Sequence, residues 1–218
     1  MTSYLAVNIL GGLLIVTSLL VVLSKTPQRA TLLYSLQSMI LVALLVALGV
    51  TTGSRELFTW AVTAFITKAV LVPGIMLFAL RKIGADAKQA VPSAISPVVA
   101  IILVAVELFL CFIAVNGIGL PTAVEVKPAL AVSLAHFFVG LTCIITQRNI
   151  LKQVFGYCLM ENGSHVTLAL LAPEAPGLVE IGIATDAIFA VVIMAIVAVR
   201  IHKVVGSLDA DDLRELKG

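Results

Sequence analysis

Residues 156–165 read GYCLMENGSH, a segment that contains a glutamate, an asparagine, a serine and a histidine. The segment lies inside a mostly apolar run, residues 150–172, which is long enough to cross a bilayer. An ionisable side chain near the bilayer centre costs about 2.5–3.5 kcal/mol. Glu161 and His165 therefore need partners inside the protein or a function at that depth.

The composition indicates a membrane protein. The chain has 218 residues, of which 61% are hydrophobic and only 12% charged, with a mean hydropathy of +1.15. Soluble domains carry about 25% charged residues, so a soluble globular fold is excluded. The first apolar run, 4–24, lacks a basic start and a small-residue cleavage site, so we expect a retained helix and not a signal peptide.

Apolar runs of about 20 residues predict an all-α integral membrane protein with a single membrane domain. Seven segments qualify, at residues 4–24, 31–52, 56–80, 95–116, 128–147, 150–172 and 178–201.

Basic residues predict the orientation, because cytoplasmic connections are enriched in Lys and Arg. With the N-terminus outside, the outer connections hold only Arg55 and Lys127. The inner connections then hold Lys25, Arg29, Arg81, Lys82, Lys88, Arg148, Lys152, Arg200, Lys203, Arg214 and Lys217. We therefore expect the N-terminus outside and the C-terminus in the cytoplasm, with Tyr4 and Trp60 as anchors near the outer surface. The charged tail after Gly206 is expected to be a solvated end or a docking strip for a cytoplasmic partner.

An internal repeat is a further hypothesis. The pair Gln28-Arg29 and the pair Gln147-Arg148 both precede apolar runs, and Lys68 and Asp186 both follow a threonine. Two parallel three-helix repeats, residues 4–80 and 128–203, would then be joined by the helix 95–116. The alternative is that unrelated apolar helices align by chance.

Six ionisable side chains fall within the expected spans, and they are the candidate proton-relay residues: Glu161, Asp186, Lys68, His165, His136 and Glu107. At about 1.5 Å rise per residue, Lys68 lies roughly 18 Å into its helix and Glu161 roughly 16 Å. Alternating acidic and basic groups at that depth are what a gated proton relay requires. Asp186 is the most telling, because only Thr185 beside it is polar.

Structural explanations stay open for several of these residues. Glu161 could form a fixed ion pair with Lys68, and His165 could simply bridge two helices by a hydrogen bond. His136 and His165 could ligate a b-type haem, and Glu107 could face a partner subunit instead of this bundle. Cys158, Glu161, Ser164 and His165 follow at i, i+3, i+6 and i+7, which predicts one shared helical face, with Asn162 nearby.

Motifs of soluble enzymes are missing from the sequence. It contains no P-loop, dinucleotide fingerprint, iron–sulfur cysteine cluster or nucleophile elbow. The three cysteines fall in apolar runs without metal or disulfide spacing, which is typical of small buried side chains. The net charge of +2 is accounted for by the inner connections, so nucleic-acid binding is not supported. The chain alone is not expected to be an enzyme.

Four segments carry a resemblance to a known family: QRNILKQVFGYCLMENGSH (147–165), LVEIGIATDAIFAVVIM (178–194), FITKAVLVPGIM (65–76) and KPALAVSLAHF (127–137). Together they resemble hydrogenase-4 component E, a membrane subunit of group 4 NiFe hydrogenases that include formate hydrogenlyase-type complexes. The last three helices are also similar to the K subunit of respiratory complex I and the C subunit of multisubunit Na⁺/H⁺ antiporters.

The resemblance implies a role and a set of partners. In the complex I subunit two glutamates on successive helices lie in the proton path; the second matches Asp186 and the first falls on Cys158. A thiol has an ordinary pKa near 8.5, so Glu161, one turn further, could take its place. No metal or quinone is implied in this chain. The NiFe centre and the iron–sulfur clusters would belong to cytoplasmic hydrogenase subunits, and antiporter-like and complex I-like membrane subunits would be its neighbours.

The resulting prediction is a multi-pass subunit of the bacterial cytoplasmic membrane that couples hydrogenase redox chemistry to proton, or Na⁺, movement. Glu161 and Asp186 would exchange protons, with Lys68 as their countercharge. His165 and His136 would extend the route outward, and Glu107 would pass protons to a neighbouring subunit. The alternatives are a non-pumping anchor or assembly subunit, a cation/proton antiporter subunit, or a solute transporter with a broken helix at Pro73-Gly74.

Overall fold

The computed structural model describes residues 4–88, 90–117, 119 and 124–215, and within these the chain is helical and without strands. The elements are α1 (Leu5–Leu23), α2 (Pro27–Thr52), α3 (Glu56–Ala64), η1 (Phe65–Leu71), α4 (Val72–Ile83), η2 (Gly84–Lys88), α5 (Pro97–Gly117), η3 (Val124–Val126), α6 (Lys127–Thr146), α7 (Ile150–Leu171), α8 (Gly177–Val205) and η4 (Ala210–Glu215). The predicted all-helical class and its seven spans are confirmed, with α3, η1 and α4 forming one continuous span.

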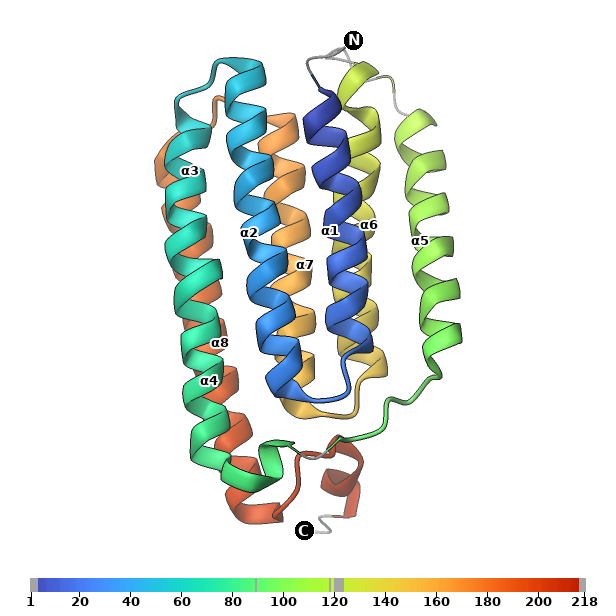
Figure 1. The fold of residues 1–218 in the computed structure, drawn as a ribbon, viewed down its shortest axis with the longest axis vertical. Helices are drawn as coiled ribbons and strands as arrows, with labels where there is room; N and C mark the ends of the chain where they lie inside the picture. Colours follow the sequence, from blue (N-terminus) through green and yellow to red (C-terminus); the bar gives the residue numbers. More distant parts are fainter. Residues whose placement is uncertain (1–3, 89, 118, 120–123, 216–218) are drawn as a thin grey trace.

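Six spans are long and apolar enough to cross a membrane, and together they make a multi-pass membrane protein. The seventh, α7, has 22 residues, but its polar centre keeps it out of that group. It nevertheless runs the length of the bundle between the other helices (Figure 1). The two ends of the chain lie at opposite ends of the bundle, as an odd number of spans requires. Which end faces the cytoplasm stays a prediction from the Lys and Arg distribution. Of the residues behind that prediction, Lys217 lies outside the described residues, as do the side chains of Lys88 and Arg214.

The helices form two layers. One layer contains α1, α2 and the α3–α4 span, and the other contains α6, α7 and α8 (Figure 1). Facing pairs pack across the layers: α1 on α6, α2 on α7 and α4 on α8. Helix α5 lies at one edge and packs mainly on α6. A parallel duplication would give such a layered pairing, and the duplication itself remains a hypothesis.

Three glycines bring α6 and α7 into backbone contact. A Cβ on Gly140 would lie 2.2 Å from the backbone nitrogen of Met160, and one on Gly163 would lie 2.4 Å from that of Phe137. A Cβ on Gly156 would come within 2.8 Å of Ile144. Small residues permit such close approach of helices in membranes, where apolar burial gives little net attraction. These glycines therefore hold the polar α7 in the middle of the bundle.

The third span widens at η1 into a π-helix that contains Lys68. Proline lacks a backbone N–H, so Pro73 leaves the carbonyl of Ala69, four residues earlier, without its usual helical partner. The Ser35 hydroxyl of α2 donates to that carbonyl at 3.1 Å. The expected irregularity near Pro73-Gly74 is thus a continuous helix with a π segment, a feature that is frequent at functional sites.

The tail after α8 folds back on its own chain. Leu208 is buried, its carbonyl accepts from the backbone N–H of Ile150 at 3.0 Å, and Ala210 donates to Arg148 at 2.9 Å. Arg148 also pairs with Asp211 at 3.1 Å. The tail residues as far as Asp211 therefore cover the α6–α7 turn instead of extending freely.

Trp60 differs from its predicted position. Its side chain is fully buried, at 0% exposure, and packs against His165, so the prediction of an interface anchor is wrong. The α3 face that carries it packs inward, towards α2 and α8. Tyr4, by contrast, is partly exposed just before α1.

Candidate functional site: a polar chain at mid-bundle

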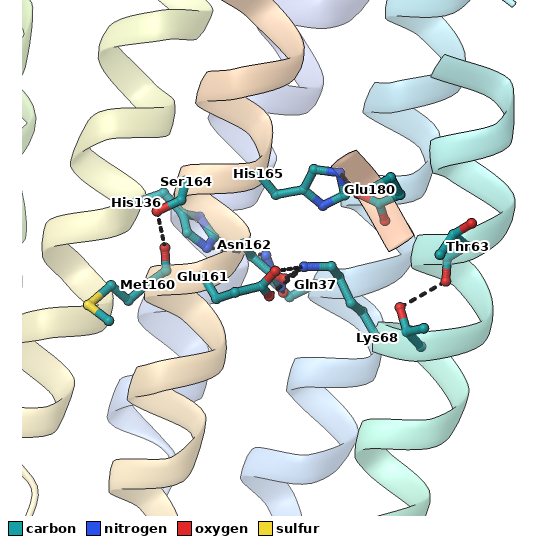
Figure 2. Close-up of polar contacts among 11 residues, drawn as sticks. Gln37, Thr63, Lys68, His136, Met160, Glu161, Asn162, Ser164, His165 and Glu180 are labelled. Atoms are coloured by element: carbon teal, nitrogen blue, oxygen red, sulfur yellow. Dashed lines mark hydrogen bonds and ion pairs between the residues drawn. The ribbon is translucent and has the colours of Figure 1, made fainter. Parts of the chain in front are cut away.

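Lys68 and Glu161 meet in the interior. The Lys68 ammonium lies at an ion-pair contact with the Glu161 carboxylate and also donates to Asn162 Oδ1 at 3.0 Å (Figure 2). The Lys68 side chain is 1% exposed and that of Glu161 13%. The predicted contact between these two residues is confirmed. Lys68 lies in the π segment η1, so the charged side chain is on the irregular part of the third span, just before Pro73.

Hydrogen bonds extend this pair across the bundle. Asn162 Nδ2 donates to Gln37 Oε1 at 2.9 Å, and Gln37 Nε2 lies 3.3 Å from His136 Nε2. His136 Nδ1 lies 3.1 Å from Ser18 Oγ. Glu161, Lys68, Asn162, Gln37, His136 and Ser18, the mid-bundle chain, thus link α7, η1, α2, α6 and α1.

The contacts determine the state of His136. The Ser18 hydroxyl donates to the carbonyl of Leu14 at 2.6 Å, so its oxygen accepts from His136 Nδ1. The Gln37 amide nitrogen can only donate, so His136 Nε2 accepts. These contacts fit a neutral imidazole with its proton on Nδ1. His136 Nε2 could accept a second proton only if the Gln37 amide moved away.

His165 and Glu180 form a second pair of ionisable groups, which lies above the mid-bundle chain in Figure 2. His165 Nε2 is 2.7 Å from Glu180 Oε2, and both side chains have 0% exposure. The ring of Trp60 covers His165 at a centroid distance of 5.4 Å. The His165 N–H is not aligned on the carboxylate, and within the described residues no other polar group bonds either side chain. One proton on this pair makes it ionised or neutral according to which partner holds it.

Glu180 was missed by sequence reasoning, and it replaces Asp186 as the buried carboxyl of the last helix. Asp186 is exposed on the outer face of α8, so the structure does not bring it into the interior, contrary to expectation. The signal was present in the spacing of small residues. The buried residues of α8 are Glu180, Ala184, Ala187, Val191, Ala195 and Ala198, one helical stripe that includes position 180 and excludes 186.

The other predicted residues divide between interior and edge. On α7, Cys158, Asn162 and His165 are buried, whereas Ser164 is exposed and bonds the Met160 carbonyl at 3.3 Å, so the predicted four-residue face is wrong at Ser164. Glu107 on α5 is half-buried and accepts a hydrogen bond from Thr142 of α6. It therefore contacts this bundle and is not part of the mid-bundle chain.

The site brings together titratable and hydrogen-bonding side chains from several helices. Across the described residues, no three His, Cys, Asp or Glu side chains come together as a metal site. His136 and His165 engage different partners, Ser18 with Gln37 and Glu180 respectively, instead of a common centre. Hydrogen-bonded groups that bind and release protons, shielded from both surfaces, are suited to moving a proton through the protein.

Comparison with known proteins gives the family. The family model of NADH-ubiquinone/plastoquinone oxidoreductase chain 4L matches residues 128–218. Hydrogenase-4 component E of Escherichia coli is 47% identical over 218 residues, which is 100% of both chains, and the protein of that name from Shigella flexneri has the same identity and coverage. An uncharacterized protein of Mycobacterium tuberculosis is 24% identical over 211 residues, or 97% of this chain and 96% of its own. No solved structure matches.

The relatives match the whole chain, and the chain 4L model covers the part that contains α6, α7 and α8. The resemblance read from the four sequence segments is therefore confirmed over the full length. The chain belongs to the hydrogenase-4 component E family.

Proposed function

We propose that the chain is a non-catalytic membrane subunit of a hydrogenase-type complex in the bacterial cytoplasmic membrane, and that its mid-bundle chain transfers protons. The single observation that carries the proposal is the buried Lys68–Glu161 pair at the centre of a hydrogen-bonded chain through five elements. Family membership supports the first part, because the relatives are named as components of hydrogenase-4.

Glu161 is the proposed proton acceptor, and the position of Lys68 is proposed to control when Glu161 takes up a proton. In the arrangement observed, the Lys68 ammonium is the countercharge of the Glu161 carboxylate. If Lys68 turns towards Asn162, whose oxygen it already contacts at 3.0 Å, an isolated carboxylate in an apolar interior becomes costly and takes up a proton. Lys68 lies in the π segment η1, a kind of irregularity that is frequent at functional sites. A change in a partner subunit would then alternate Glu161 between its two states.

His165 and Glu180 form the proposed continuation towards the end of the bundle where α8 begins. His165 lies one helical turn from Glu161 on α7, and Figure 2 places its ring between the mid-bundle chain and Glu180. Its Nδ1 is buried and without a hydrogen-bond partner in the described structure, so it can accept a proton. Asp186, on the outer face of α8, would act only at an interface with a neighbouring subunit.

Variants that replace each carboxyl group by a neutral amide of the same shape test this route in the assembled complex. In sealed vesicles, Glu161→Gln and Glu180→Gln should each lower proton translocation at least tenfold. Hydrogen oxidation with an artificial acceptor should stay near the wild-type rate, since that chemistry belongs to partner subunits. Ser164→Ala, on the exposed face of α7, is the matched control. Normal translocation by both glutamine variants would refute the relay.

A structural role is the second candidate, and one observation favours it. Lys68 donates to three acceptor atoms, which is the full capacity of an ammonium group. Such a pair could be fixed and serve only to order the helices of an anchor or assembly subunit. Removing both charges together separates the two candidates, because a buried pair can often be replaced by neutral groups without loss of stability. An assembled complex that still moves protons would favour the structural role, and one that no longer does would favour the relay.

A further inference from the structure

An open groove runs along the outer surface between α4 with its preceding η1 residues and α8, with a volume of about 730 Å³. Its walls are apolar from Val70 and Leu71 down to Phe78 on one side, and along Ile196 on the other. Gly74 widens the groove, because a Cβ at that position would meet nothing within 4 Å. Neither the mid-bundle chain nor the His165–Glu180 pair contributes to this surface.

Three basic side chains close one end of the groove: Lys82 of α4, and Arg200 and Lys203 of α8. This is the end of the bundle that carries the C-terminus (Figure 1). All three side chains are exposed, and none forms an ion pair with a carboxylate within the described structure. The Lys82 ammonium rests over the Phe78 ring at 5.4 Å. Asp86, a carboxylate at the same end, pairs with His202 at 3.1 Å.

The length of the groove suits a lipid chain. Val70 and Lys82 are twelve positions apart on one helix, or about 18 Å at the helical rise. One leaflet of the hydrocarbon core is about 15 Å thick. The cations therefore lie at headgroup depth when the apolar walls lie among the acyl chains.

We infer that this groove binds an anionic phospholipid, with an acyl chain along the apolar walls and the phosphate at Lys82, Arg200 and Lys203. Basic pockets between transmembrane helices on the cytoplasmic side are suited to anionic headgroups. A partner helix would have to supply carboxylates at the same depth to balance three cations. In the predicted orientation, with this end in the cytoplasm, the anionic surface of the inner leaflet supplies that charge without any specific partner.

Native mass spectrometry of the full-length chain in detergent, titrated with phosphatidylglycerol or phosphatidylcholine, tests the inference. The wild type should retain phosphatidylglycerol at least tenfold more tightly. The variant Lys82→Gln/Arg200→Gln/Lys203→Gln should lose this preference, at about fivefold per charge. The control variant Lys25→Gln/Arg29→Gln/Arg81→Gln removes the same charge at the same end, outside the groove, and should keep it. Equal loss in both variants would overturn the inference, because it would show a general charge effect.

Gly74→Leu probes the acyl-chain half separately, since it fills the groove without changing any charge. It should weaken phosphatidylglycerol binding several-fold, and added inorganic phosphate should not displace the lipid. Unchanged binding by Gly74→Leu together with displacement by phosphate would overturn the lipid assignment in favour of a simple anion site. Loss of neighbouring subunits from the purified complex in the charge variant, with lipid retention unchanged, would overturn it in favour of a protein interface.

Discussion

Helices α5 and α7 reverse the usual relation between apolarity and burial. Helix α5 is the most apolar of the six apolar spans and the least buried, whereas α7 falls short of their apolarity and lies in the centre. In water the apolar face of a helix turns inward, but in lipid an outward apolar face costs nothing. On α7 it is polar side chains and glycines, among them Asn162, His165 and Gly163, that lie in the interior, whereas the apolarity of a helix does not show how deeply it is buried.

The largest effect is expected where α7 touches α6 through its glycines. Gly140→Ala would force a backbone shift, since its Cβ would come within 2.2 Å of the Met160 nitrogen. Overpacking typically costs about 1–3 kcal/mol and occasionally more. Because the clash here is with backbone atoms, we expect Gly140→Ala to lower the free energy of unfolding in detergent by about 5 kcal/mol or more, beyond the usual range for one substitution. Gly182→Ala, where a Cβ meets nothing within 4 Å, is the control and should be neutral or stabilising. Similar loss in both would mean that the α6–α7 contact is not close.

The next effect concerns the buried ion pair between Lys68 of η1 and Glu161 of α7. Lys68→Met leaves the Glu161 carboxylate buried without its cation, and breaking a buried pair from one side costs about 3–5 kcal/mol. In Lys68→Met/Glu161→Gln most of that loss should return. A double-mutant cycle, with unfolding free energies measured at one pH, gives the coupling. Additive losses of the two single variants would contradict an interior ion pair.

The smallest effect belongs to α5. Glu107→Gln keeps an oxygen that can accept from Thr142, and the side chain is half-buried at the edge of the bundle. We expect a change in unfolding free energy within about 1 kcal/mol, the net value of a typical hydrogen bond. The same unfolding measurement tests this expectation. A loss as large as that of Lys68→Met would contradict the difference in burial between α5 and α7.

Much of the fold follows from the sequence. The seven spans could be predicted because each needs about 20 apolar residues. The Lys68–Glu161 contact could be predicted because two opposite charges at similar depth have few other partners. The wide turn at η1 had only a partial signal, since Pro73 and Gly74 indicate an irregularity without its form.

The errors have one physical origin. Lipid-facing and core-facing apolar positions have the same composition, so apolarity alone does not say which way an ionisable side chain on an apolar helix points. Asp186 was expected inside and is exposed, while Glu180 was overlooked because it lies in the first turn of α8. The spacing of alanines on α8 would have separated them. Trp60 was misplaced by the same ambiguity, since an aromatic near a helix end suits either an interface or a core.

Proton translocation by the complex carrying Lys68→Met/Glu161→Gln tests the central claim most directly. Because both charges are removed together, the bundle should stay folded and the complex should assemble. The account predicts wild-type hydrogen oxidation with an artificial acceptor and at least a tenfold fall in protons moved per electron pair. A wild-type proton-to-electron ratio in that assembled variant would contradict it and leave the mid-bundle chain with a structural role only.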